Sequence, residues 1–152
     1  MVLPFALAVQ LASAATPSES QDALYQALTP RHLERSCTEL AALSSTPHAD
    51  FVWLAEHAER PSWVAIRSAE CVLELYAEPA VSDLTRWMQS PDTLGLALTT
   101  VHAMDRVPVS VAQTVLQAGL AGPLADALRP RVQRLTTPAL RQLAAEPLPA
   151  NL

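Results

Sequence analysis

Residues 61–91 read PSWVAIRSAECVLELYAEPAVSDLTRWMQSP, and this stretch decides the fold. It opens on a proline, contains a second at position 79 and ends on a third. Between the first two prolines, small or apolar residues follow the i, i+4, i+7 spacing of one helix face, at Val64, Ser68, Cys71, Val72 and Leu75. The stretch therefore predicts one helix over 62–76 and a second over 80–89.

The prolines repeat along the chain with a period of about 31 residues. One series stands at positions 30, 61, 91 and 123, and another at 47, 79, 108 and 138. Proline suits the first position of a helix, because its missing N–H would have no partner there and its fixed φ matches the helical turn. Each proline therefore marks an expected helix start. Hydroxyl residues that precede four of them are expected to cap the first N–H groups: Thr29, Thr46, Ser90 and Thr137.

The chain thus alternates between two kinds of helix, called A and B. The A helices are expected at 31–44, 62–76, 92–104 and 124–135, and the B helices at 48–59, 80–89, 109–121 and 139–146. No segment shows the alternation typical of a strand. One such pair cannot bury its apolar face alone, so we expect an all-α fold in which about four pairs stack into a right-handed α-solenoid.

The repeat domain is expected to span residues 30–146. Its four repeats cover 30–60, 61–90, 91–122 and 123–146. A leader with a short helix at 23–28 occupies 15–29, and a tail occupies 147–152.

Residues 30–146 resemble the short-period HEAT repeats, which are about 30 residues long. Residues 64–75 (VAIRSAECVLEL) are similar to that family's A helix, and residues 80–88 match its B-helix pattern Ala-Val-x-x-Leu-x-x-x-Leu, with Met88 at the last position. Ala65 and Leu73 depart from the Arg and Gly that are common in the A helix. Armadillo and tetratricopeptide arrays are the alternatives. The resemblance implies a scaffold that binds protein partners across a concave face lined by B helices, and it implies no chemistry.

Composition excludes several classes of protein. Half of the 152 residues are hydrophobic and the net charge is −5, which excludes intrinsic disorder. Ten Arg, no Lys and an acidic balance argue against a nucleic-acid partner, since affinity for phosphate backbones comes from clustered cations. No apolar run reaches the 18 or so residues that a membrane span needs.

The first residues predict export. Residues 2–14 (VLPFALAVQLASA) are apolar and uncharged and end in the small-x-small pattern that signal peptidase accepts, although no basic residue precedes them. We therefore expect a signal peptide over 1–14 and a periplasmic or secreted product. The product would be cytoplasmic if this segment is not a signal.

Steps of 30 residues along the B helices connect two rows of side chains. One row is Trp53, Asp83 and Gln113, and the other is His57, Trp87 and Gln117. Exposed tryptophans anchor protein interfaces, so one interpretation is a partner-binding ridge made of these six residues. The alternative is that Trp53 and Trp87 are buried between neighbouring repeats and only fill volume.

The two cysteines, Cys37 and Cys71, project from the core face of adjacent A helices. An even count in an exported protein favours a disulfide, and two small buried hydrophobes are the alternative. The cysteines are one helical turn out of step, so a bond between them requires the helices to tilt. Zinc would need four convergent ligands, and no such spacing is present, so no metal is expected.

No motif predicts catalysis. His102 and Asp105 form an i, i+3 pair that is typical of a surface hydrogen bond. A basic cluster on the last A helix is expected to complement the helix dipole, with anion or partner binding as the alternative; it consists of Arg129, Arg131 and Arg134. We expect no catalytic residue and no cofactor. The expected function is a non-catalytic exported adaptor for a protein partner, and the alternative is an enzyme or accessory lyase that uses a helical-repeat groove.

Overall fold

The computed structural model describes residues 16–31 and 35–145, and within these ranges it contains helices and no strand. The prediction of an all-α fold is therefore confirmed for this part of the chain. The expected signal peptide at 1–14 and the tail at 147–152 lie outside the described residues.

The helix positions follow the proline series closely from residue 47 onward. Every α-helix from there on begins within two residues of the expected start. The helices are α1 (Glu19–Leu28), α2 (Cys37–Ala41), α3 (Pro47–His57), α4 (Ser62–Tyr76), α5 (Val81–Trp87), α6 (Leu94–Ala103), α7 (Val109–Leu120), α8 (Ala125–Val132) and α9 (Pro138–Ala145), with 3-10 turns at Pro91–Thr93 and Met104–Arg106.

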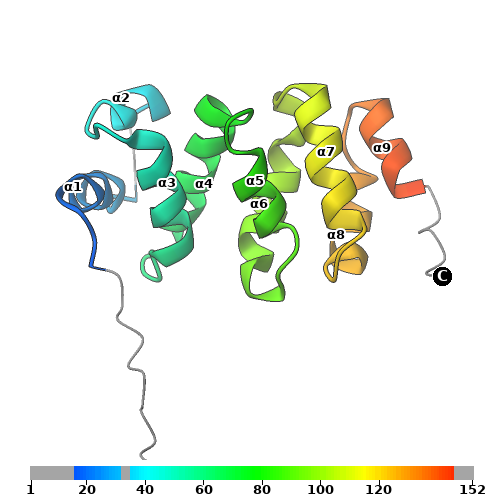
Figure 1. Cartoon of the computed structure of the whole chain (residues 1–152), viewed down its shortest axis with the longest axis horizontal. Coiled ribbons are helices and arrows are strands. Elements are labelled where there is room, and N and C mark those ends of the chain that lie inside the picture. The colour runs from blue at the N-terminus through cyan, green and yellow to red at the C-terminus, as the bar shows by residue number, and fades with distance from the viewer. Residues whose placement is uncertain (1–15, 32–34, 146–152) are drawn as a thin grey trace, which may run out of the picture.

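The helices follow one another in chain order along the longest axis of the molecule (Figure 1). They form two rows. In one row α2 packs on α4, α4 on α6 and α6 on α8, and in the other α5 packs on α7 and α7 on α9. α3 precedes α5 in the second row and packs on α4 and α1. The first row thus holds the helices expected as A and the second those expected as B.

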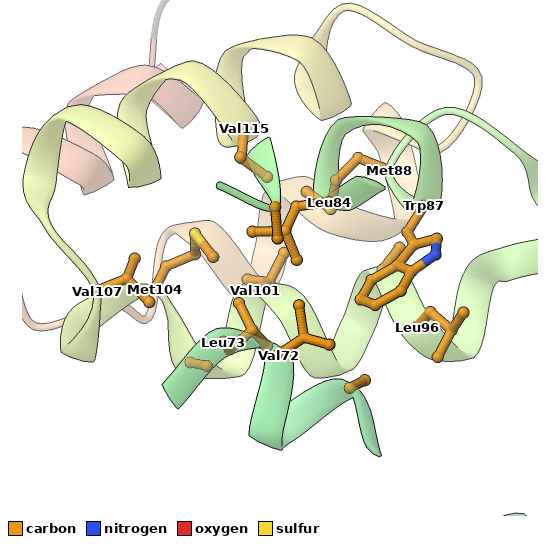
Figure 2. Packing of buried hydrophobic residues seen from close by; sticks show 14 of the residues in the cluster. Val72, Leu73, Leu84, Trp87, Met88, Leu96, Val101, Met104, Val107 and Val115 are labelled. Atoms are coloured by element: carbon orange, nitrogen blue, oxygen red, sulfur yellow. The ribbon is translucent and has the colours of Figure 1, made fainter. Parts of the chain in front are cut away.

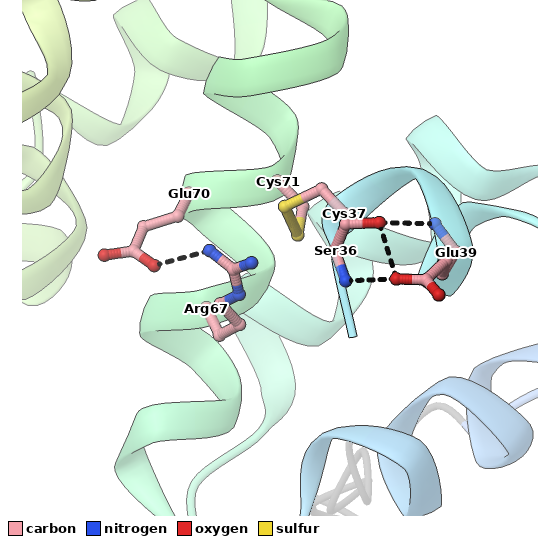
Figure 3. Close-up of a disulfide and its surroundings, with 6 residues drawn as sticks. All are labelled: Ser36, Cys37, Glu39, Arg67, Glu70 and Cys71. Carbon is pink, nitrogen blue, oxygen red and sulfur yellow. Dashed lines mark hydrogen bonds and ion pairs between the residues drawn. A yellow bond between two sulfur atoms is a disulfide. The ribbon is translucent and has the colours of Figure 1, made fainter. Parts of the chain in front are cut away.

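The first A helix is much shorter than expected. The prediction of a helix over 31–44 is wrong, because α2 covers only Cys37–Ala41. Ser36 and Glu39 explain the late start: the Ser36 hydroxyl accepts a hydrogen bond from the Glu39 N–H, and the Glu39 carboxylate accepts one from the Ser36 N–H (Figure 3). This capping box begins the helix six residues after the expected position.

Cys37 and Cys71 form a disulfide that ties α2 to α4, with 5.2 Å between their Cα atoms (Figure 3). The predicted bond is confirmed. Because α2 begins at Cys37, this cysteine occupies the first turn of a short helix rather than the middle of a long one. The comparison of positions along two long neighbouring helices, which predicted a mismatch of one turn, therefore does not apply. Both cysteines are fully buried.

One hydrophobic core runs between the two rows. Figure 2 shows its middle, where Trp87 and Leu84 of α5 lie with Val72 of α4 and Val101 of α6. Gly119 allows a close approach, since a Cβ added there would lie 2.6 Å from the terminal methyl carbon of Met88. In α4 the apolar spacing placed Val64, Ser68, Cys71 and Val72 correctly in the core, whereas Leu75 is only half-buried.

The predicted hydroxyl caps are mostly wrong. Only Ser90 caps as predicted, by accepting a hydrogen bond from the Asp92 N–H. The Thr46 hydroxyl donates to Asp50 instead, and the Thr29 hydroxyl donates to the Tyr25 carbonyl at the end of α1. At α9 the cap comes from Asp105 instead of the Thr137 hydroxyl: its carboxylate accepts hydrogen bonds from the backbone N–H groups of Thr136 and Thr137, which precede the helix.

Candidate functional site

Trp53 lies on α3, and its indole is half-buried. Phe51, Leu54 and Ala55 are buried, which leaves Trp53 and His57 on the outer side of the helix. The two rings stack with 4.7 Å between their centroids, and His57 Nδ1 lies 2.8 Å from the Trp53 carbonyl oxygen. One turn of helix thus presents an aromatic pair to solvent.

A groove of about 440 Å³ separates α3 from α1 beside this pair. Apolar and aromatic side chains dominate its lining, and charged residues stand among them. We call it the Trp53 groove; it is lined by Pro17, Gln21, Asp22, Tyr25, Trp53, Leu54, His57, Ala58, Glu59 and Arg60. Tyr25 crosses the groove at one end, because its hydroxyl donates to the Arg60 carbonyl at 2.6 Å.

Asp50 holds α1 in place against α3. Its side chain is 3% exposed and accepts hydrogen bonds from Ser20 at 2.7 Å and Gln21 at 3.2 Å, both on α1. Hydroxyls of Ser44 and Thr46 also donate to it. Burial by itself raises the pKa of Asp50, but these hydrogen bonds together outweigh burial and hold the pKa below its ordinary value. The carboxylate is therefore a charged anchor for the wall of the groove.

A second hollow, of about 310 Å³, lies on the other side of Trp53 toward α5. His48, Val52, Trp53, Glu56 and Asp83 contribute to its lining together with Ala49. Trp53 is thus shared by both hollows and separates them.

Arg86 neutralises much of the charge in this second hollow. Its guanidinium contacts Glu56 and lies 3.0 Å from an Asp83 oxygen, and both contacts raise the pKa of Arg86, with the Glu56 hydrogen bond as the larger cause. His48 Nε2 lies 3.5 Å from the other Asp83 oxygen. Two carboxylates therefore share one arginine and one histidine.

The structure separates the six residues of the predicted ridge. Trp53 and His57 line the Trp53 groove, and Asp83 joins Trp53 in the second hollow. Gln113 is half-buried and Gln117 exposed on α7, and neither lines these two hollows. Whether any of the six residues binds a partner stays a prediction.

Trp87 does not lie on the surface. Its side chain is 0% exposed, and its Nε1 donates to Glu56 of α3 at 2.8 Å. The expectation of an exposed Trp87 is wrong, and the alternative of a volume-filling residue is correct for this position. The physical reason is that Trp87 lies at the edge of the apolar stripe of α5, where the neighbouring α3 supplies an acceptor for its N–H.

Sequence reasoning missed the contribution of α1. The helix begins at Glu19 instead of residue 23, because Ser18 and Gln21 form a capping box. The four added residues include Gln21 and Asp22, which line the groove. The Ser-x-x-Gln pattern was the signal that could have located this start.

Carboxylates with a shifted pKa serve structural roles elsewhere. Burial raises the pKa of Asp105, but the backbone N–H groups of Thr136 and Thr137 outweigh it and lower that pKa to about 2. The expected His102 hydrogen bond is therefore replaced by bonds to the backbone ahead of α9. Glu39 has a lowered pKa chiefly because it accepts the Ser36 backbone N–H in the capping box of α2.

The three arginines of the predicted basic cluster have different surroundings. Arg129 donates to the Ala144 carbonyl of α9, while Arg131 and Arg134 line a hollow of about 290 Å³ with His102 and Asp105. Within residues 16–31 and 35–145, no group of three His, Cys, Asp or Glu side chains could hold a metal ion.

No helix in the described part of the chain combines the length and apolar character that crossing a membrane requires. No protein-family model, curated protein or solved structure matches the sequence or the fold. The function is therefore inferred from the geometry around Trp53.

Proposed function

We propose that the protein is a non-catalytic exported scaffold that binds a protein partner through its B-helix face, centred on the Trp53 groove. In this proposal the two rows of helices form a right-handed α-solenoid of HEAT-like repeats. The observation that carries it is the stacked pair of Trp53 and His57, which stands half-exposed between hollows of 440 and 310 Å³.

The chemistry of the groove suits a protein partner. Tyr25, Trp53 and Ala58 supply apolar contact area, and charged side chains surround them. Protein interfaces have this organisation, with an aromatic centre that excludes water and a polar margin. The rings have few rotatable bonds and are partly fixed by stacking and by the Tyr25 hydrogen bond, so ordering them on binding costs little entropy.

The disulfide supports export. Disulfides form and persist in oxidising compartments such as the periplasm and the extracellular space, and they are rare in the cytosol. The bond between Cys37 and Cys71 ties α2 to α4, and α4 packs on α3. The same bond therefore supports both the compartment and the rigidity of the face that carries Trp53.

The proposal is tested by capturing partners from the native envelope fraction with the wild type and two variants. Trp53→Ala removes the centre of the site. Leu94→Ala is the control, since Leu94 is 37% exposed at the start of α6 and lines neither hollow. Circular dichroism must first show that both variants are folded.

We expect a specific protein to be captured by the wild type and by Leu94→Ala, and lost with Trp53→Ala. Equal capture by all three proteins would move the binding site away from α3. Capture of no protein would reject the adaptor function and direct attention to small ligands or catalysis.

A further inference from the structure

The charges of the chain are unevenly distributed between its two halves. Residues 1–90 contain eleven of the fifteen Asp and Glu but only five of the ten Arg, whereas residues 91–152 contain four acidic residues and five Arg. The first half therefore carries the net negative charge of the protein, and the Trp53 groove lies in this half.

The same imbalance exists around the groove itself. Asp22 on α1 and Glu59 after α3 are both exposed, and neither forms an ion pair within the described residues. Arg60 is the cation that lines the groove with them. In the adjoining hollow, Glu56 and Asp83 share the single guanidinium of Arg86.

Across both hollows, carboxylates thus outnumber guanidinium groups by four to two. If a partner inserts an apolar side chain beside Trp53, the residues next to that side chain in the partner's sequence lie near these carboxylates. Opposite charges on the two partners speed association and set specificity, and like charges oppose binding. The groove therefore selects for a cationic neighbour to the apolar anchor.

We propose that the occupant of the Trp53 groove is a segment of the protein partner in which an apolar side chain is flanked by Lys or Arg. This inference rests on the proposed function and adds the chemistry of the partner. The apolar side chain lies against Trp53, Tyr25 and Ala58. The flanking cations lie within the field of Asp22 and Glu59, which acts over about 8 Å at physiological ionic strength.

The test is a selection from a displayed library of random peptides on the oxidised wild-type protein, with counter-selection on Trp53→Ala. We expect the enriched peptides to share an apolar residue with Lys or Arg within a few positions of it. Enrichment of neutral or acidic peptides would overturn the inference and leave the proposed function standing. Recovery of no peptide that depends on Trp53 would also overturn it.

A second measurement assigns the charge preference to particular side chains. The double variant Asp22→Asn/Glu59→Gln keeps the shape of the groove and removes two charges. We expect it to bind a selected peptide at least several-fold more weakly than the wild type at low salt, with a smaller salt dependence. The control Glu74→Gln/Glu78→Gln removes two exposed charges at the end of α4 and should bind as the wild type does.

Equal losses in the two double variants would mean that only the overall charge matters, and this would overturn the assignment to the groove. The partner capture described above separates the two proposals. If capture depends on Trp53 while peptide binding ignores charge, the scaffold function stands and the cationic motif fails. If neither depends on Trp53, both fail.

Discussion

Trp53 and Trp87 stand on consecutive helices of the same row, yet their surroundings differ completely. Trp87 is fully buried, and its N–H is satisfied by Glu56 of the preceding helix. Trp53 is half-buried and separates two open hollows. α5 packs on α7 and is contacted on its other side by Glu56 of α3, whereas α3 is the first helix of its row and has α1 on the side away from α5 (Figure 1). The end of a helical array therefore leaves a tryptophan partly exposed that an internal position would cover.

The largest effect is expected from Trp87→Ala. Deleting a buried indole leaves a cavity in the core and removes one of the hydrogen bonds to Glu56, so we expect the free energy of unfolding to fall by about 3–5 kcal/mol. Urea denaturation followed by circular dichroism measures this change. Trp87→Phe fills more of the cavity and should lose less. A loss below about 1 kcal/mol would show that α5 packs more loosely than in this structure.

Removal of the disulfide comes next. The bond closes a loop of 34 residues, and Cys37→Ala/Cys71→Ala should lower the free energy of unfolding by about 3–4 kcal/mol through the greater entropy of the unfolded chain. The bond anchors α2 to α4, on which α3 packs. The variant therefore also tests whether the helices around Trp53 depend on the bond more than the helices around Trp87 do. Denaturation of the wild type with and without a reducing agent checks the result, and equal midpoints would contradict it.

Asp50→Asn is expected to cost about 1–3 kcal/mol, because hydrogen bonds to a buried charged group are strong. The effect should depend on pH. The folded-state pKa of Asp50 is lowered, so its contribution is present above the unfolded value of about 3.9 and is lost as pH falls through the folded value. The stability difference between wild type and variant should therefore shrink below pH 4. A constant difference from pH 7 to pH 2 would contradict this.

The smallest effect on stability is expected from Trp53→Ala. Its indole is only partly buried, so the free energy of unfolding should change by about 1 kcal/mol. Thermal unfolding, run beside Trp87→Ala, gives the direct comparison. A loss as large as that of Trp87→Ala would show that Trp53 is a core residue and would remove the basis for a binding role.

Local signals predicted most of the fold. The proline series and the apolar spacing located the helices from α3 to α9, because a helix start and a buried stripe each depend on residues close together in the sequence. The same reasoning failed at α1 and α2, where capping boxes at Ser18 and Ser36 determined the starts. These patterns are also local and could have been found.

The candidate site was predictable only in part. The 30-residue steps drew attention to Trp53, His57 and Asp83, which line the two hollows, but they treated Trp87 as equivalent to its neighbours. Periodicity gives the direction in which a side chain leaves its helix. It does not say whether another helix lies in that direction.

The sequence by itself determined that the protein is helical, where most helices begin and which positions form the core, since these properties follow from the spacing of prolines and apolar residues. Only the tertiary structure decided that Trp87 is covered while Trp53 is not, that Asp50 anchors α1, and that α1 completes a groove. These outcomes depend on contacts between residues about 30 positions apart, and neither helical period nor composition specifies such contacts.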